Sequence, residues 1–175
     1  MIKGRLVVLR AVEREDIERW RVWFNDPETR RFMDRLYPYS AYDGERFYEQ
    51  QRGSETDKVF SIDTLEGVHI GSIGLHHLDW VSRHAELGIM IGDEAYRGKG
   101  YGADAIRTLL GFAFSEMNLH RVELLAMEYN ARGIACYRRV GFKHEGIRRQ
   151  AHFSQGRYWD MVVMGILASE FEAEK

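Results

Sequence analysis

Arg97-Gly98-Lys99-Gly100-Tyr101-Gly102 is the stretch of this sequence that decides the fold. It follows an alternating apolar segment, residues 85–91, which predicts a strand. It opens residues 101–117, where apolar side chains recur at the offsets of one face of an amphipathic helix. Three glycines and two cations at a strand-to-helix junction turn backbone N–H groups toward an anion, and phosphate is the anion we expect.

Other glycine loops fit this stretch less well. A P-loop has four residues between its first glycine and its Gly-Lys pair, whereas five separate Gly92 from Gly98, and no Ser or Thr follows Lys99. Residues 100–105 satisfy the dinucleotide pattern G-x-G-x-x-A, with Glu128 at the distance of its ribose-binding acid. A dinucleotide-binding loop directly follows its strand, however, whereas residues 92–99 intervene in this sequence. Too little chain also remains after the loop for a doubly wound sheet. A solvated surface loop is the remaining alternative.

Size and composition indicate one domain, residues 1–175, in a reducing compartment. The chain has 45% hydrophobic and 30% charged residues, which is ordinary for a globular protein. A net charge of −2 gives no global basic field, so we expect neither nucleic acid nor a membrane as a partner. The sequence shows no apolar run of membrane-spanning length and no signal-peptide pattern. Cys136 is the single cysteine, which excludes an intrachain disulfide and favours a cytoplasmic protein.

Hydrophobic periodicity and turn residues predict the other elements. Helices are expected over residues 13–25, 43–51, 101–117 and 130–140, the last ended by Gly141. Strands are expected over residues 6–9, 59–63, 68–75, 85–91, 121–127, 142–153 and 158–167. Turns around Gly67 and Gly156 would join two pairs of strands as hairpins. This order of elements predicts a mixed α/β (α+β) sheet with helices packed on it.

A second motif gives the glycine loop a more specific meaning. Arg97, Gly100 and Gly102 follow the spacing Arg/Gln-x-x-Gly-x-Gly/Ala, and Asn130 stands seven residues before Tyr137, ahead of Gly141-Phe142. Together these resemble the two signatures of the GNAT superfamily of N-acetyltransferases, and the similarity covers essentially the whole chain. The pattern is closest to the branch that holds ribosomal-protein N-terminal acetyltransferases and spermidine N-acetyltransferases. Gly133 departs from it, because this branch usually has alanine there.

The resemblance implies a single GNAT-type domain with acetyl-CoA as the acyl donor and no metal. Its mixed, mostly antiparallel sheet would have about seven strands, splayed at the acetyl-CoA site, and about four helices. Amides of the glycine loop would hold the pyrophosphate, and backbone groups at the splay would bond the pantetheine and the oxyanion. The implied coenzyme-binding residues are Ile89, Met90, Ile91, Arg97, Gly98, Lys99, Gly100, Tyr101, Gly102, Asn130 and Arg132.

Tyr137 is the general acid that the resemblance implies, placed to protonate the departing thiolate. A phenol with a pKa of about 10 is protonated at neutral pH and can give its proton to a thiolate with a basicity near 8.5. A core tyrosine is the alternative, since Ile134, Tyr137 and Val140 form an apolar helical stripe.

Glu86 is the candidate base that makes the attacking amine neutral. It lies eleven residues before Arg97, where several members of the family carry a catalytic carboxylate. Two alternatives stay open: a structural ion pair with Arg83 or Arg121, and deprotonation through a chain of waters.

The sequence predicts the class of acceptor only coarsely. The pocket is expected from residues 26–52, the strand pair up to Trp80, and the hairpin around residues 152–158. Residues 30–35 are largely basic, which disfavours a trication and favours a peptide N-terminus or a small amine over spermidine, an aminoglycoside or an amino sugar. A non-catalytic acyl-CoA sensor is the alternative of a different class. The partly apolar segment 32–42 is interpreted as either a homodimer interface or a lid.

Overall fold

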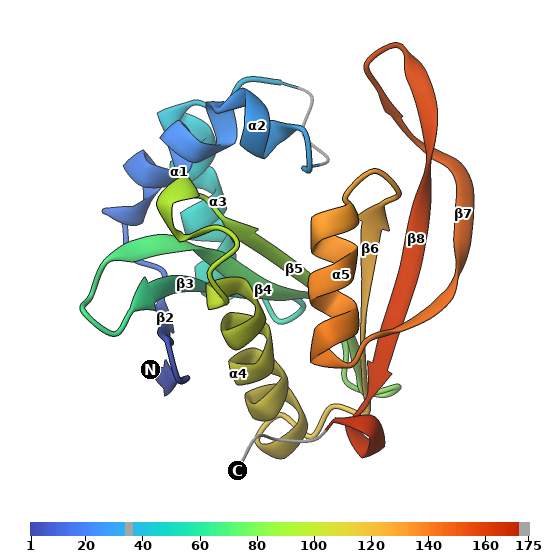
Figure 1. Cartoon of the computed structure of the whole chain (residues 1–175). Helices are drawn as coiled ribbons and strands as arrows, with labels where there is room; N and C mark the ends of the chain where they lie inside the picture. Colours follow the sequence, from blue (N-terminus) through green and yellow to red (C-terminus); the bar gives the residue numbers. More distant parts are fainter. Residues whose placement is uncertain (34–36, 172–175) are drawn as a thin grey trace.

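The computed structural model describes residues 1–33 and 37–171, whose arrangement Figure 1 shows. One eight-stranded sheet has the order β1-β2-β3-β4-β5-β6-β8-β7. The strands are β1 (Ile2–Lys3), β2 (Val7–Ala11), β3 (Lys58–Thr64), β4 (His69–Asp79), β5 (His84–Ile91), β6 (Arg121–Met127), β7 (Lys143–Ser154) and β8 (Arg157–Leu167). The helices are α1 (Asp16–Asn25), α2 (Pro27–Arg30), α3 (Ala41–Gly53), α4 (Tyr101–Ser115) and α5 (Ala131–Val140), with 3₁₀ turns η1 (Glu94–Tyr96) and η2 (Ala168–Glu170).

The predicted mixed, mostly antiparallel sheet is confirmed, because β5 and β6 are the one parallel pair in it. The structure has one strand and one helix more than the sequence predicted, namely β1 and α2. β1 pairs with β2 over two residues, and α2 is a single turn whose first amides are capped by the Asp26 carboxylate. Both are too short to carry a periodic pattern. Element ends also shift, because caps set them: a capping box of Ser40 and Asp43 starts α3 two residues before the expected position.

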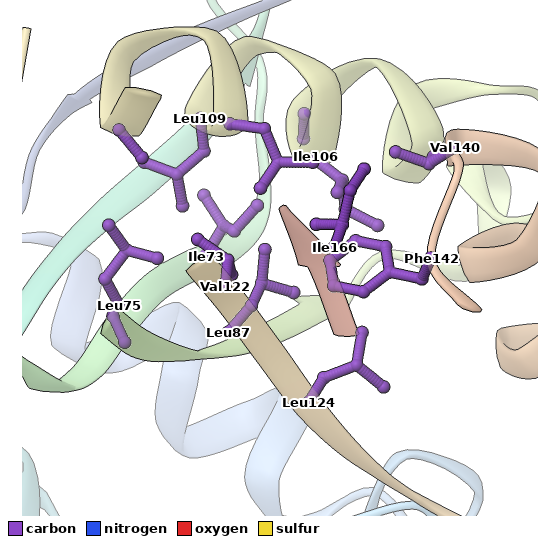
Figure 2. Close-up of a cluster of buried hydrophobic side chains, with 14 of the residues drawn as sticks. Ile73, Leu75, Leu87, Ile106, Leu109, Val122, Leu124, Val140, Phe142 and Ile166 are labelled. Atoms are coloured by element: carbon purple, nitrogen blue, oxygen red, sulfur yellow. The ribbon is translucent and has the colours of Figure 1, made fainter. Parts of the chain in front are cut away.

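The main hydrophobic core lies between the sheet and the helices α4 and α5. Figure 2 shows Ile106 and Leu109 of α4 above Ile73, Leu87 and Val122 of the sheet, with Val140 and Phe142 closing one end. The same alternation that buries Val122, Leu124 and Ala126 under α5 sends the intervening side chains of β6 to the opposite face. The core therefore fixes which residues of the central strands face α4 and which face α1.

A smaller aromatic core lies on the other face of the sheet, under α1 and α3. It consists of Trp20, Trp23, Tyr39 and Met90, with Phe24 and Phe47 packed against it. Met90 belongs to β5, so this core is continuous with the strand that the sequence assigns to the coenzyme. A buried polar group anchors the start of α1 to the sheet: Asp16 binds Arg10 of β2 and Ser61 of β3, and lies 3.0 Å from the His69 imidazole of β4.

Candidate active site

A splay between β5 and β6 is the central feature of the site. The two strands pair only over His84↔Arg121, Ala85↔Val122 and Glu86↔Glu123. Beyond Glu86, β5 stays paired with β4 as far as Ile91, and β6 stays paired with β8 as far as Met127. The facing edges of these two segments therefore carry N–H and C=O groups that no neighbouring strand satisfies. The predicted splay at residues 89–91 is confirmed, and its edges can bond an extended amide chain such as pantetheine.

The glycine loop lies at the open end of this splay. Gly98 and Gly100 adopt φ of +74° and +95°, a left-handed conformation that non-glycine residues rarely adopt. Gly100 is the N-cap of α4, and the first N–H groups of a helix have no acceptor within the helix. A Cβ on Gly102 would stand 3.6 Å from the Ile91 side chain, so the first turn of α4 packs closely on the end of β5. Free amides at a helix N-terminus suit a pyrophosphate, as the sequence predicts.

Arg97 has a bracing position that the sequence did not predict. Its guanidinium donates to the carbonyls of Ile91 at 2.9 Å and Gly92 at 2.7 Å, and to the Thr29 hydroxyl at 2.8 Å. These bonds tie the glycine loop to the end of β5 and to α2. Arg97 thus already has protein partners in this structure, whereas the Lys99 side chain is exposed.

The second motif begins where β6 ends. The Asn130 N–H donates to the Met127 carbonyl at 2.8 Å, and its side-chain Oδ1 caps α5 by accepting from the Gly133 N–H at 3.0 Å. The side chain lies flat against Gly133, since a Cβ there would stand 2.5 Å from Nδ2. Glycine at this position therefore permits the capped orientation of Asn130. Arg132 in the first turn of α5 is exposed.

Tyr137 lies at the border of the main core, as do Ile89 and Ile91. Its ring packs edge-on against Phe142, with the centroids 6.2 Å apart, and its hydroxyl has no hydrogen-bond partner among the residues that the structure describes. Burial, with a smaller contribution from Cys136, raises the pKa of Tyr137 to about 12. The phenol therefore stays protonated at any assay pH, and its role in proton transfer would be that of a donor.

Glu86 is about one-third exposed, and its charged neighbour is neither of the arginines considered from the sequence. Its Oε2 lies 3.5 Å from Nδ1 of His77. Arg121 is occupied by Glu123 and Glu145, and Arg83 donates to the Asn118 side chain. Glu86 therefore forms no ion pair with Arg83 or Arg121, the structural alternative considered from the sequence. It lies at the closed end of the splay, as the last residue of β5 that pairs with β6.

Two groups on the face that carries Glu86 depend on contacts that the sequence did not predict, although the sequence marks His76 as a residue that could line the acceptor cleft. An Asp57–His76 pair joins the loop before β3 to β4, with Nδ1 of His76 2.9 Å from the Asp57 carboxylate. No local pattern marks a contact between residues 19 positions apart on different elements. The second group is aromatic, and its core is Tyr129 stacked edge-on with Trp159 at 4.7 Å.

The aromatic group lies two residues beyond the open end of β6. The Tyr129 hydroxyl donates to the Arg31 carbonyl at 2.8 Å, which joins the end of α2 to this loop across 98 positions. Guanidinium groups cover the rings: Arg31 lies over Phe32 and Tyr129, and Arg157 lies 3.3 Å above Trp159. Of the basic stretch at residues 30–35, Asp34 and Arg35 fall outside the described residues.

Two hollows lie near the segments expected to form the acceptor pocket; the first lies just outside the hairpin at residues 152–158, and the second lies within residues 26–52. One, of about 600 Å³, is lined by Arg149, Gln150 and Asp160 beside an irregularity in β7. The other, of about 180 Å³, lies against α3 and is lined by Tyr39, Asp43, Arg46, Phe47 and Gln50. Within the described ranges there is no cluster of three His, Cys, Asp or Glu side chains that could hold a metal ion. In the same ranges, no helix has the length and apolar character needed to cross a bilayer.

Comparison with known proteins identifies the fold and the donor. Residues 6–143 match the acetyltransferase (GNAT) domain family. The chain belongs to the GNAT acetyltransferases. It is 31% identical over 172 residues to YdaF of Bacillus subtilis, provisionally named a ribosomal N-acetyltransferase, covering 98% of this chain and 88% of the relative.

Solved GNAT structures share the architecture. The spermidine N-acetyltransferase of Vibrio cholerae in complex with CoA and spermine superposes with a TM-score of 0.88 at 28% identity, over 94% of this chain and 97% of the other. A dodecameric structure of the same enzyme has a TM-score of 0.80 at 27% identity, over 94% and 95% of the two chains. This GNAT protein is an acetyl-CoA-dependent N-acetyltransferase, and its splay and glycine loop fit the coenzyme that the family uses.

Proposed function

We propose that this N-acetyltransferase acetylates the primary amine of a peptide or protein N-terminus or of a small molecule. The observation that carries this proposal is the positive charge around the open end of the splay. Arg31 and Arg157 cover the aromatic group there, and the hollow next to it is lined by Arg149 together with the single carboxylate of Asp160, so arginines outnumber carboxylates among these groups. A polycation would be repelled by these guanidinium groups, whereas an amine with one positive charge and an acidic or neutral remainder would not.

A polyamine is the second candidate, because the relatives include spermidine N-acetyltransferases of Vibrio cholerae and Escherichia coli. A thiol-release assay at pH 8 against an unblocked peptide, spermidine and an aminoglycoside separates the candidates. We expect kcat/KM for the peptide to exceed that for spermidine by at least tenfold. A preference for spermidine would overturn the peptide proposal. No turnover of any amine, despite measured acetyl-CoA binding, would leave a non-catalytic acyl-CoA sensor.

We propose the following roles for the chain's own residues. Amides of the glycine loop, with Lys99, bind the pyrophosphate, and the open edge of β5 at residues 89–91 binds the pantetheine and the oxyanion. Asn130 and Arg132 complete the coenzyme site. The amine attacks the thioester carbonyl directly, a C–N bond forms, and Tyr137 protonates the thiolate as the C–S bond breaks. Glu86 serves as a base, directly or through water.

Replacement of Tyr137 tests this assignment. We expect Tyr137→Phe to leave the acetyl-CoA Kd within threefold of wild type and to lower kcat at least tenfold, because the ring packing is kept while the proton is lost. Phe114→Tyr, the reverse exchange at a partly buried position of α4, is the control variant and should keep wild-type kcat. Wild-type turnover in Tyr137→Phe would remove Tyr137 from the mechanism.

Self-association and a cytoplasmic location complete the proposal. Tyr37 and Tyr42 lie in the segment 32–42 that the sequence marks as a candidate homodimer interface. Their side chains are 75% and 70% exposed, which supports an interface there. Sedimentation of the purified chain measures its oligomeric state, and a monomer at micromolar concentration would argue against the interface. The single partly buried cysteine, Cys136, is consistent with a reducing compartment.

A further inference from the structure

The Asp57–His76 pair is a polar group for which neither the fold nor the proposed roles give a use. Nδ1 of His76 lies 2.9 Å from Oδ1 of Asp57. The Asp57 carboxylate is held in turn by the hydroxyls of Ser54 at 3.2 Å and Thr56 at 2.9 Å. The two side chains are 28% and 33% exposed, so the pair is neither buried in the core nor free in solvent.

Hydrogen bonding fixes the form of the imidazole. Burial alone would raise the pKa of Asp57, but the bonds from His76, Thr56 and Ser54 outweigh it and lower that pKa. An ionised carboxylate only accepts hydrogen bonds, so Nδ1 must carry the proton that joins the pair. In the neutral imidazole the lone pair is then on Nε2, which has no partner among the residues that the structure describes.

Two glycines leave room for this nitrogen. Gly74 of β4 and Gly88 of β5 are direct cross-strand partners, and they share a sheet face with His76. Nε2 lies 3.1 Å from where a Cβ on Gly74 would stand and 3.3 Å from where a Cβ on Gly88 would stand. A larger residue at either position would push the imidazole aside. The imidazole therefore lies over the two glycines, in a space that a side chain at Gly88 or Gly74 would narrow, with the Val59 side chain beside it.

Nε2 of His76 lies beside Gly88, in the part of β5 that is no longer paired with β6. β5 leaves β6 after Glu86, and Gly88 is two residues further along, about 7 Å at the rise of a strand. The charged groups that face the imidazole are Asp57 from the loop before β3 and Glu86, its partner in register on β5. Glu86 in turn contacts His77 and lies beside Glu123 of β6.

We propose that His76, oriented by Asp57, removes the proton from the acceptor's ammonium group before the amine attacks. Nε2 takes one proton from the R–NH₃⁺ group, and the Asp57 carboxylate stabilises the imidazolium that forms. The neutral amine then forms the C–N bond with the acyl carbon. Its second proton goes to Glu86 or water, the C–S bond breaks, and the thiolate takes the Tyr137 proton. The second proton passes from Glu86 or water back to the Tyr137 phenolate, and His76 returns its proton to solvent, so the net products are the amide, the thiol and one proton. This assignment rests on the proposed function.

An imidazole suits this step better than a carboxylate. Unperturbed imidazoles titrate near pH 6.5 and carboxylates near 4.3, and a general base is most effective when its pKa is close to the working pH. An α-amine with a pKa of about 8 is mostly protonated at pH 7, so most encounters with the enzyme need this step.

The pH dependence of His76→Gln tests the proposal with an unblocked peptide as acceptor. We expect kcat/KM at pH 7 to fall at least tenfold, with the loss shrinking to less than threefold near pH 10, where the free amine needs no base. Asp57→Asn should cause a smaller loss with the same pH dependence, and should add nothing to His76→Gln. His144→Gln, an exposed histidine on β7, is the matched control and should follow the wild-type profile.

Circular dichroism and the acetyl-CoA Kd, expected within threefold of wild type, show whether each variant is folded. An equal loss at every pH, or no loss, in a folded His76→Gln variant would overturn the role of His76 while leaving the N-acetyltransferase assignment intact. A wild-type enzyme that turns over no peptide, polyamine or aminoglycoside would overturn the proposed acceptor class, and this role with it.

Discussion

Asp16→Asn tests how helix α1 is held to the sheet. The Asp16 carboxylate accepts two bonds from the Arg10 guanidinium at 2.7 and 2.8 Å, one from the Ser61 hydroxyl at 2.6 Å, and one from the Glu13 N–H at 2.9 Å. Asparagine keeps the shape but removes the charge, and its NH₂ group faces donors. Disruption of a buried, hydrogen-bonded ion pair costs about 3–5 kcal/mol.

Asparagine retains one acceptor oxygen, so we expect about 3 kcal/mol, the lower end of that range. For a domain of this size each kcal/mol lowers Tm by about 2–4 °C, so Tm should fall by about 6–12 °C. Thermal unfolding followed by circular dichroism at pH 7 measures the shift. Glu18→Gln, which removes the exposed partner of Arg21 on the same helix, should leave Tm unchanged within error.

The pH dependence gives this prediction a sign. Burial alone would raise the pKa of Asp16, but the bonds from Arg10, His69, Ser61 and the Glu13 N–H hold it far below its ordinary value. A folded pKa below the unfolded value of about 3.9 stabilises the protein above that pH, and this stabilisation is lost as the pH falls. The difference in unfolding free energy between wild type and Asp16→Asn should be constant from pH 8 to 5 and shrink below pH 4. A Tm within about 2 °C of wild type at pH 7, or an equal difference at pH 3.5, would refute the reasoning.

Three further predictions concern the coenzyme side. Gly100→Ala forces alanine to φ +95°, so we expect the acetyl-CoA Kd by calorimetry to rise about tenfold, whereas Gly111→Ala inside α4 should leave it unchanged. A Cβ at Gly133 would displace the Asn130 side chain from its cap and leave it available to the coenzyme, so we expect Gly133→Ala to lower the acetyl-CoA Kd at least threefold. Adding Asn130→Ala to this variant should abolish the gain. Because the pKa of Tyr137 is raised to about 12, kcat should show no descending limb below about pH 10. An unchanged acetyl-CoA Kd in Gly100→Ala or Gly133→Ala, or a descending limb of kcat near pH 9, would contradict these expectations.

Local requirements of the backbone explain why much of the fold and the donor site was predictable. Gly98 and Gly100 have positive φ, Gly141 ends α5 with φ +119°, and α4 has one continuous apolar face. Each of these features depends on residues within one or two turns of chain. The short elements β1 and α2 carry no such signal, because two to four residues cannot establish a period.

The sequence by itself determined the strand–loop–helix unit at residues 85–117, because helix periodicity and the need for glycine at positive φ are properties of neighbouring residues. Together with the second motif at residues 130–142, this unit resembles the GNAT signatures, and that resemblance implied acetyl-CoA as the donor. Only the tertiary structure decided what surrounds that unit. The bonds from Arg97 to Ile91 and Thr29, the end of β5–β6 pairing at Glu86, and the contact of Asp57 with His76 all depend on strand register and helix packing. A slip of one residue in any of these strands would send His76 or Glu86 to the opposite face of the sheet. The position of the base is therefore a property of the assembled sheet.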